Sequence, residues 1–496
     1  MGASPLRGGR GGDCCAVVAA DGRGVGKGAT ASGARGPRRA GSAAPGGGTV
    51  NDGPERLPRR LGVWSAAAVL VGSTIGSGIF RVPAEVAERV GAVGAMGLLW
   101  VLGGLFALAG ALTLAELAVL FPRSGGIYVF LREGWGRLPA FLFGWTELLI
   151  IRPSALGAIA MLFAEYLRVF VPLTGAGVRL VAAGAILTLA LANIRSLTWG
   201  AAVQNASTLA KVLALVGLAV LAFGLGDPQR GAFAGPIAFA PLSWGGFGLA
   251  LVAVMWTYDG WADLTFLAGE VRDPARTLPR ALLGGTLAVV AIYLLVNAAY
   301  LYVLTPAAMA GRPLVAADAA RAVVGGAGAS LVAAMVLLSA FGALNGSTMT
   351  GPRIFYAMAE DGLFFRPVAA VHPRYRTPWV AIALAAALGI AYVAVRTFEQ
   401  LADAFVLGIW PFYALAVGAV FRLRRHRPDV PRPYRTWGYP FVPLLFLVAS
   451  VAMLANALVQ QPVSTAVGFG VILAGVPVYH LWRRQPKPPA PTTSRT

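Results

Sequence analysis

Apolar stretches of about 20 residues with almost no charge recur along most of this 496-residue chain, and a helix of that length crosses the hydrocarbon core of a bilayer. Only 12% of the residues are charged, about half the share found in an ordinary soluble domain. The expected fold is therefore an all-α polytopic membrane protein, and a soluble enzyme is excluded. Twelve transmembrane helices are predicted, at residues 62–85, 93–121, 139–169, 177–195, 200–224, 242–270, 278–304, 327–360, 378–395, 399–421, 439–459 and 465–482.

The positive charges lie mostly in alternate loops. The formal net charge of +20 would indicate a nucleic-acid partner in a soluble protein. Here the loops and proximal tails on one predicted side hold about three times as many Lys and Arg as those on the other, which the positive-inside rule assigns to the cytoplasm. We therefore expect a multi-pass protein of the plasma membrane (cell inner membrane) with both termini cytoplasmic and no nucleic-acid partner.

The two ends of the chain carry no span. Residues 1–60 are rich in Gly, Ala and Arg without apolar periodicity, so we predict a disordered basic cytoplasmic tail, and a second cytoplasmic tail at 483–496. An organellar transit peptide, or a true start near Val50, is an alternative for the first segment. Cys14 and Cys15 are the two cysteines of the chain, so no disulfide framework or cysteine metal site is expected in the membrane.

Two predicted spans are interrupted near their middle. Gly72–Phe80 holds three glycines and three hydroxyl residues within nine positions, and Trp256–Trp261 places Asp259 and Gly260 inside span six. Close helix packing through small residues would account for one such segment. Paired interruptions in corresponding spans instead indicate a secondary transporter with inverted repeats. The predicted organisation is a first repeat at 61–224 (spans 1–5), a second at 242–421 (spans 6–10) and two extra helices at 439–482.

A break in a membrane helix exposes backbone groups that can bind a small polar solute. Amides at Gly76, Ser77 and Gly78 can hold an anion at a helix N-terminus. Carbonyls at Thr74 and Ile75, and at Trp256 and Thr257, can hold a cation. One group of each sign a few ångströms apart fits the zwitterionic head of an α-amino acid. The glycines let the main chain approach this ligand.

Charged residues inside the spans are further candidates. Lys211 lies deep in span five, where a lysine is expected to face the interior and contact a carbonyl or carboxylate. Asp259 and Asp263 share a face wherever span six is helical, so either a proton-coupling pair or an ionised Asp259 held by Lys211 or loop donors is conceivable. Glu147 and Arg152 are five apart, about 140° around an α-helix, and are not expected to pair directly.

These motifs together resemble the amino acid-polyamine-organocation superfamily, and within it the L-type amino acid transporters and their bacterial relatives. The resemblance covers roughly residues 60 to 480 and is carried by Gly72–Phe80, Arg152-Pro153-Ser154, Tyr258–Trp261, Gly269–Pro274, Leu278-Pro279, Asn345–Ser347 and Pro352–Tyr356. It implies a leucine-transporter-like 5+5 fold with spans one and six unwound around the substrate. It also implies alternating access, with spans one, two, six and seven moving against a scaffold.

The resemblance implies roles for individual residues. The Lys211 ammonium would replace a sodium ion by bonding to the backbone near Gly72 to Ile75, and Trp256 would act as a gate. Trp410 and Tyr413 are weaker candidates for the side-chain pocket. The predicted substrate-binding residues are Thr74, Ile75, Gly76, Ser77, Gly78, Ile79, Trp256, Thr257, Tyr258, Asp259, Gly260 and Asn345.

The expected function is sodium-independent transport of L-amino acids, by exchange or with a proton. A polyamine, cationic amino acid or organic-cation transporter of the same fold is the main alternative, since Asp259 and Glu147 could bind positive charge. An enzyme is not expected, because no metal-ligand or nucleophile-base spacing occurs within a span, and neither a cofactor nor a metal is predicted. Animal L-type transporters attach to a glycoprotein through a cysteine between spans three and four. No cysteine lies there, so no disulfide-linked accessory subunit is expected.

Overall fold

The computed structural model describes Arg59 and residues 61–123, 125–195, 197–235, 237, 243–370, 372–375 and 377–483. These residues form helices and no strand, apart from an isolated bridge between Leu61 and Val271. The predicted tails, 1–60 and 483–496, lie outside the described residues except at Arg59 and Arg483, and so do Cys14 and Cys15. The helical prediction is therefore confirmed for the described part of the chain.

The elements follow the predicted spans closely. In chain order they are α1 (Val63–Thr74), η1 (Gly78–Phe80), α2 (Val82–Val90), α3 (Val93–Leu120), α4 (Ile127–Trp135), α5 (Arg137–Thr146), η2 (Glu147–Ile151), α6 (Arg152–Leu167), α7 (Gly175–Arg195), α8 (Leu197–Leu225), η3 (Pro228–Arg230), η4 (Ala232–Ala234), α9 (Trp244–Tyr258), α10 (Asp263–Phe266), η5 (Ala268–Glu270), α11 (Pro274–Val303), α12 (Pro306–Met309), α13 (Val315–Glu360), η6 (Arg366–Ala369), α14 (Trp379–Val395), α15 (Phe398–His426), α16 (Phe441–Gln460) and α17 (Pro462–Arg483).

Nine helical stretches within the described residues are long and apolar enough to cross a membrane: α3, α5 to α6, α7, α8, α11, α13, α15, α16 and α17. Three shorter apolar helices, α1, α9 and α14, occupy the other predicted spans. The label α13 covers two helices that meet at Gly325, where φ is 73° and the backbone is not helical, and the second of them covers the predicted eighth span, 327–360. The count of twelve membrane crossings stays a prediction.

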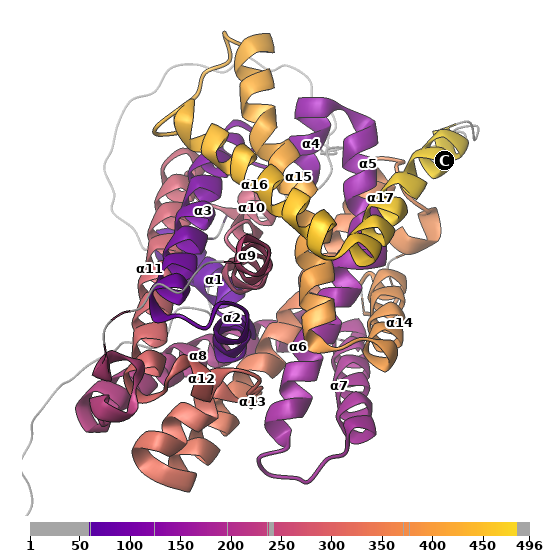
Figure 1. The fold of residues 1–496 in the computed structure, drawn as a ribbon. Coiled ribbons are helices and arrows are strands. Elements are labelled where there is room, and N and C mark those ends of the chain that lie inside the picture. Colours follow the sequence, from indigo (N-terminus) through magenta and orange to yellow (C-terminus); the bar gives the residue numbers. More distant parts are fainter. Residues whose placement is uncertain are drawn as a thin grey trace, which may run out of the picture. The chain divides into compact units, whose positions relative to one another are not determined.

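The interrupted helices lie among the long ones. In Figure 1, α1 and α9 are near the middle of the helices, with α3 and α11 on one side and α6, α7 and α14 on another. Helix α1 packs against α11 and α8, whereas α9 packs against α3, α15 and α16. Both breaks are therefore surrounded by protein, as backbone groups at membrane depth require.

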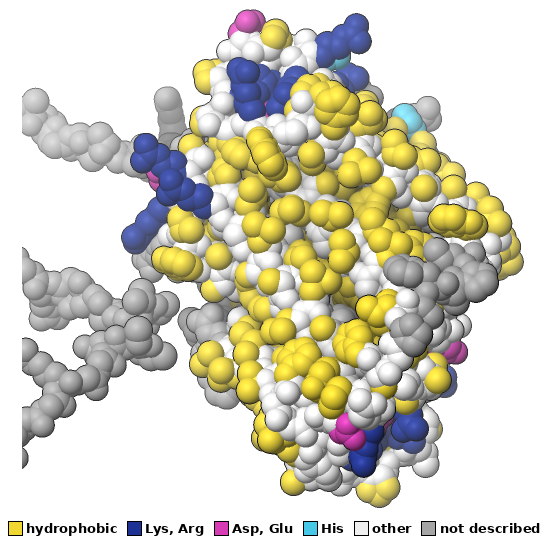
Figure 2. Space-filling model, turned by 60° about the vertical axis from the view of Figure 1, so that its left-hand side comes forward, with side chains coloured by type: hydrophobic (Ala, Val, Ile, Leu, Met, Phe, Trp, Pro, Cys, Tyr) yellow, Lys and Arg dark blue, Asp and Glu magenta, His cyan; other side chains and the backbone are white. Residues whose placement is uncertain are grey.

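Hydrophobic side chains also cover much of the outside. On the face drawn in Figure 2 they fill the middle, while Lys and Arg side chains lie toward its edges. Helices α16 and α17 are the least enclosed of the nine, with 28% and 22% of their apolar windows buried. Such exposed apolar area is what a lipid environment covers.

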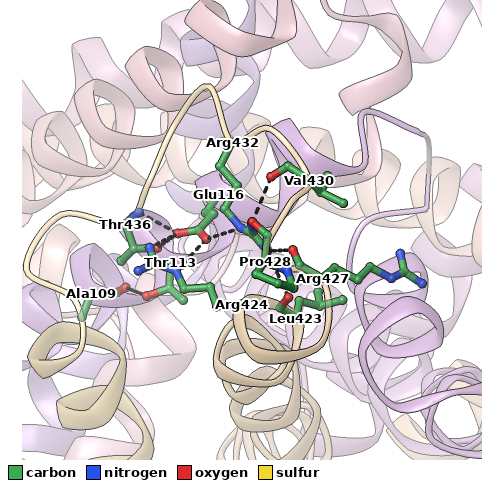
Figure 3. A network of polar contacts seen from close by, with 10 residues as sticks. All are labelled: Ala109, Thr113, Glu116, Leu423, Arg424, Arg427, Pro428, Val430, Arg432 and Thr436. Atoms are coloured by element: carbon green, nitrogen blue, oxygen red, sulfur yellow. Dashed lines mark hydrogen bonds and ion pairs between the residues drawn. The ribbon is translucent and has the colours of Figure 1, made fainter.

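One buried carboxylate joins α3 to the end of α15 (Figure 3). Glu116 is 2% exposed and accepts two hydrogen bonds from Arg424, Nε to Oε1 at 2.9 Å and Nη2 to Oε2 at 2.6 Å. Its Oε2 also accepts from the backbone N–H of Thr436 at 2.7 Å and from the Thr436 hydroxyl at 2.8 Å. The Arg432 guanidinium lies 3.5 Å from Oε1. The carboxylate thereby fixes the segment that follows α15.

We expect Glu116→Gln to lower the free energy of unfolding by about 3 kcal/mol, because it leaves the buried Arg432 and the half-buried Arg424 without their carboxylate. The check is thermal or denaturant unfolding of the purified protein in detergent. Asp429→Asn, an exposed acid in the same segment, is the matched control and should leave stability unchanged. Equal midpoints for the two variants would contradict the prediction.

Candidate functional site

The first break follows α1, which ends at Thr74. Ile75 has φ −72° and ψ 84°, and the Gly76 amide donates to the Thr74 carbonyl oxygen at 2.8 Å. This is an inverse γ-turn. The chain resumes as a short 3₁₀ turn at Gly78–Phe80 and then as α2. The helix is therefore interrupted where the glycine pattern predicts it.

The second break follows α9, which ends at Tyr258. Asp259 is extended, with φ −63° and ψ 151°, and Gly260 has φ 114°, a conformation that side-chain-bearing residues rarely adopt. Helical structure returns at Asp263 in α10. Because the backbone is not helical between Asp259 and Asp263, the expectation that they share one helix face does not apply.

The two breaks lie directly against each other. A Cβ atom built on Gly260 would be 2.7 Å from the Thr74 backbone nitrogen, and one built on Gly78 would be 2.7 Å from the Thr257 Cα. Both positions require glycine, because the obstacle is backbone. Gly76 differs, since a Cβ there meets no atom closer than the Thr74 carbonyl oxygen at 3.8 Å. Space therefore opens beside Gly76 alone among these three glycines.

The prediction that the Gly76 amide is available to an anion is wrong, because this amide closes the γ-turn by donating to the Thr74 carbonyl oxygen. A residue that we did not predict serves the carbonyl acceptors. The amides of Ser77, Gly78 and Ile79 make no recorded hydrogen bond within the described chain. The hydroxyl of Tyr293 in α11 lies 2.7 Å from the Thr74 carbonyl oxygen and 3.0 Å from that of Thr257. One hydroxyl proton serves one carbonyl at a time. A tyrosine in the middle of an apolar span is the signal that could have indicated Tyr293.

Lys211 reaches the end of α1 from α8. Its side chain is fully buried, and Nζ donates to the carbonyl oxygen of Gly72 at 2.6 Å. Helix α8 comes so close at this point that a Cβ on Gly72 would lie 2.6 Å from the Thr208 hydroxyl oxygen. The contact with the backbone near Gly72 is the one that the resemblance implies. Its replacement of a sodium ion stays a prediction.

Trp256 contacts aromatic residues at the beginning of α15. Its ring centroid is 4.9 Å from that of Phe405 and 6.2 Å from that of Phe398, edge to face in both cases. The Arg81 guanidinium lies 4.8 Å from the centre of the Phe398 ring. We call Trp256, Phe398 and Phe405 the Trp256 layer. Through Phe398 this layer contacts the Arg81 guanidinium.

This guanidinium belongs to the Arg81 cluster, formed by Arg81, Glu165 and Glu399. Arg81 follows η1, and its guanidinium pairs with Glu165 at the end of α6 and with Glu399 at the start of α15. Three elements that are distant in sequence therefore meet next to the first break.

A second set of polar side chains, the Asp361 cluster, joins α4 to the end of α13. The Asp361 carboxylate accepts from the Tyr128 hydroxyl at 2.6 Å and from Arg132 Nη1 at 2.5 Å. Burial, together with the hydrogen bond to Asp361, raises the pKa of Tyr128, so this phenol stays protonated and donates. Nearby, the Gly125 amide donates to the carbonyl oxygen of Phe266, the last residue of α10.

The acidic residue at the second break has a hydroxyl partner. The Asp259 carboxylate accepts from the Tyr413 hydroxyl of α15 at 2.8 Å, and Trp410, the other candidate in that span, stacks on Phe446 of α16. Helix α10, which carries Asp263, packs against α1. Lys211 donates to the Gly72 carbonyl oxygen. A contact between Lys211 and Asp259, one of the two alternatives for Asp259, is not recorded among the described residues.

The expectation that Glu147 and Arg152 do not pair is wrong. Residues Glu147–Ile151 form a π-helical turn, whose wider winding brings residues five apart together. Arg152 Nε donates to Glu147 Oε1 at 2.9 Å, and Nη1 donates to the Ser347 hydroxyl of α13 at 2.8 Å. Glu147 is 1% exposed, so a buried carboxylate is matched by a guanidinium.

Two predicted pocket residues have their recorded partners elsewhere. The Asn345 amide oxygen accepts from Asn193 of α7 at 2.8 Å. The Tyr258 hydroxyl donates to the carbonyl oxygen of Trp100 in α3 at 3.0 Å. Neither bond involves the interrupted backbone, so a substrate-binding role for these two residues rests on the resemblance. Among the residues that the structure describes, no group of three His, Cys, Asp or Glu side chains could hold a metal ion.

Known proteins share this sequence over most of its length. Residues 61–481 match the amino acid permease family. The serine/threonine exchanger SteT of Bacillus subtilis is 33% identical over 427 residues, which cover 86% of this chain and 97% of SteT. Human large neutral amino acids transporter small subunit 2 is 31% identical, covering 89% and 86%. The human cystine/glutamate transporter is 31% identical, covering 87% of each chain.

The match spans both interrupted helices and every long apolar helix described above. Membrane helices, paired breaks and family membership agree, and the relatives are transporters and not enzymes. The chain belongs to the amino acid permease family of the amino acid-polyamine-organocation superfamily.

Proposed function

We propose that this protein carries L-amino acids across the plasma membrane, binding them between the two helix breaks. The observation that carries the proposal is the set of amides at Ser77, Gly78 and Ile79, which have no recorded partner in the described chain. Gly78, the middle one, lies against Thr257 at the second break. They would bind the substrate carboxylate. The carbonyls of Thr74, Ile75, Trp256 and Thr257 would bind its ammonium. The names of the relatives, among them a serine/threonine exchanger, support this substrate class.

Alternating access requires the site to open to each side in turn. The Arg81 cluster and the Trp256 layer are the proposed gate toward one side, because they join the first break to α6 and α15. The Asp361 cluster and the Gly125–Phe266 bond are the proposed gate toward the other. Arg81, Trp256 and Phe266 each lie within a few residues of a break. A movement of the backbone at either break would therefore also move a residue of a proposed gate.

The proposed architecture is the 5+5 inverted repeat. The first break lies in the first span of 61–224, and the second lies in the first span of 242–421, which is the correspondence that an inverted repeat predicts. Two further helices follow in 439–482. We place both termini on the cytoplasmic side, from the distribution of Lys and Arg among the loops.

Transport is proposed to be sodium-independent. Lys211 Nζ donates to the Gly72 carbonyl oxygen near the end of α1, and we propose that this group is protonated there. A sodium ion at the same carbonyl would meet a like charge. Exchange of one amino acid for another and cotransport with a proton both remain compatible with this arrangement, and the relative SteT is named an exchanger.

A carrier of polyamines or cationic amino acids is the second candidate. It would need carboxylates free to bind a positively charged substrate. Of the two carboxylates on which this candidate rests, Glu147 is paired with Arg152, which leaves Asp259, bonded to the Tyr413 hydroxyl. One carboxylate with a neutral partner supports this candidate less than two would.

Labelled neutral L-amino acid should enter proteoliposomes that are preloaded with unlabelled amino acid, and the initial rate should be unchanged when choline replaces sodium. Competition by each proteinogenic amino acid and by spermidine then identifies the substrate class. Strict dependence on sodium would contradict the role proposed for Lys211. Competition by spermidine but by no amino acid would favour the second candidate.

Lys211→Met should reduce uptake by about tenfold or more, because it keeps most of the buried volume but removes a charged hydrogen bond. The measurement is initial uptake rate per folded protein, with size-exclusion profile and thermal midpoint as the folding check. Leu213→Met, an exposed position on the same helix, is the control. Wild-type rates from a folded Lys211→Met protein would assign the lysine a structural role.

Gly76→Val should fold but lose uptake, because the added side chain enters the open space beside the first break without meeting backbone. Gly184→Val on α7, another glycine with nothing close to its Cβ position, should keep both folding and uptake. Size-exclusion chromatography and competition binding distinguish the two effects. Normal binding by Gly76→Val would place the substrate away from this break.

A further inference from the structure

The segment between α15 and α16, residues 427–440, is held in shape from within, and we call it the connector. The side chain of Arg432 is 6% exposed. Its guanidinium donates to the carbonyl oxygens of Arg427 at 2.9 Å, Leu423 at 3.0 Å and Val430 at 3.0 Å. Glu116 also accepts hydrogen bonds from Arg424 and from Thr436 (Figure 3). These bonds hold the connector backbone in a fixed arrangement.

Four other arginines of α15 and the connector lie at the surface: Arg422, Arg425, Arg427 and Arg435. Arg427 is 3.2 Å from a Glu133 carboxylate oxygen, and the Arg422 guanidinium lies 5.3 Å from the centre of the Trp135 ring. Arg425 and Arg435 have no recorded ion pair or hydrogen bond from their side chains to the described residues. Asp429 is the one acid in the connector sequence. The surface therefore carries excess positive charge.

Large apolar side chains are exposed beside these charges. Trp437 is 78% exposed and Phe441 is 77% exposed. Phe441 is the first residue of α16, an apolar helix long enough to cross the membrane. The connector therefore lies at the level where a membrane helix meets water, which is where exposed Trp and Phe side chains enter the lipid.

We propose that the connector binds an anionic phospholipid, with Arg425 and Arg435 paired to its head-group phosphate and Trp437 and Phe441 packed against its acyl chains. Clustered arginines next to a membrane helix attract anionic lipid head groups. The exposed aromatic pair favours a lipid over free phosphate, which offers it no apolar contact. The connector does not have to fold on binding, because Glu116 and Arg432 already fix it.

The test titrates the purified full-length protein in neutral detergent with phosphatidylglycerol, with phosphatidylcholine and with inorganic phosphate. Native mass spectrometry counts bound lipids, and the thermal midpoint is followed in parallel. Phosphatidylglycerol should bind in preference to phosphatidylcholine and raise the midpoint. The variant Arg425→Gln/Arg435→Gln should weaken its apparent affinity by about tenfold, and Trp437→Ala should weaken it further.

The matched control is Arg168→Gln/Arg179→Gln, which removes two arginines near the Arg81 cluster end of the molecule. That cluster contains the beginning of α15, and the 29 residues of α15 span about 43 Å. The control should bind phosphatidylglycerol like the wild type. Equal binding of the two lipids, equal loss in both double variants, or an equal midpoint shift from inorganic phosphate alone would each overturn the proposal.

Discussion

Backbone polar groups that leave a helix inside a membrane must find partners within the protein, at a cost of several kcal/mol for each one left unsatisfied. This constraint accounts for the hydrogen bonds that side chains make to the backbone at the two helix breaks. The carbonyl oxygens of Thr74 and Thr257 both lie within reach of the Tyr293 hydroxyl, and that of Gly72 accepts from Lys211. Side chains from α8 and α11 thus serve the Gly72 carbonyl and, one at a time, those of Thr74 and Thr257. In the proposed function, the remaining acceptors and the amides of the first break bind the ligand.

Two buried carboxylates likewise find their partners within the protein. Glu147 is held by Arg152, and Glu116 is held by Arg424 and Thr436. In each pair a guanidinium matches the planar carboxylate, so the charge is satisfied where it lies. The Glu116 pair also connects α3 to α15, two helices that pack against α9 and its break. At the breaks themselves the charged side chains have neutral partners: Lys211 donates to a backbone carbonyl, and Asp259 accepts from the Tyr413 hydroxyl.

Periodicity and glycine content predict the positions of the spans and of both breaks, because glycines weaken a helix wherever they gather inside an apolar stretch. The position of Lys211 in the middle of a predicted span also indicates that its amino group contacts an acceptor inside the protein. Periodicity and glycine content do not predict the Glu147–Arg152 pair, because residues five apart lie on different faces of an α-helix but come together in the π-helical turn that the chain adopts. The position of Asn345 against Asn193 depends on how α7 packs on α13, which no local pattern encodes. Tyr293 was missed because its role exists only once two distant breaks meet.

The short distance along the chain between each break and a polar cluster suggests how binding and opening are linked. Arg81 follows directly after η1, whose leading amides would hold the substrate carboxylate, and Trp256 lies in the last turn of α9, whose carbonyls would hold the ammonium. Both residues contact the same partner, Phe398 of α15. In the proposed transport cycle, a ligand that draws the two breaks together would also bring Trp256 and Arg81 closer to Phe398. Because Gly78 and Gly260 already touch the opposite backbone, that movement would be small, and in the proposed cycle the larger displacement for release would come from the helices that carry the breaks.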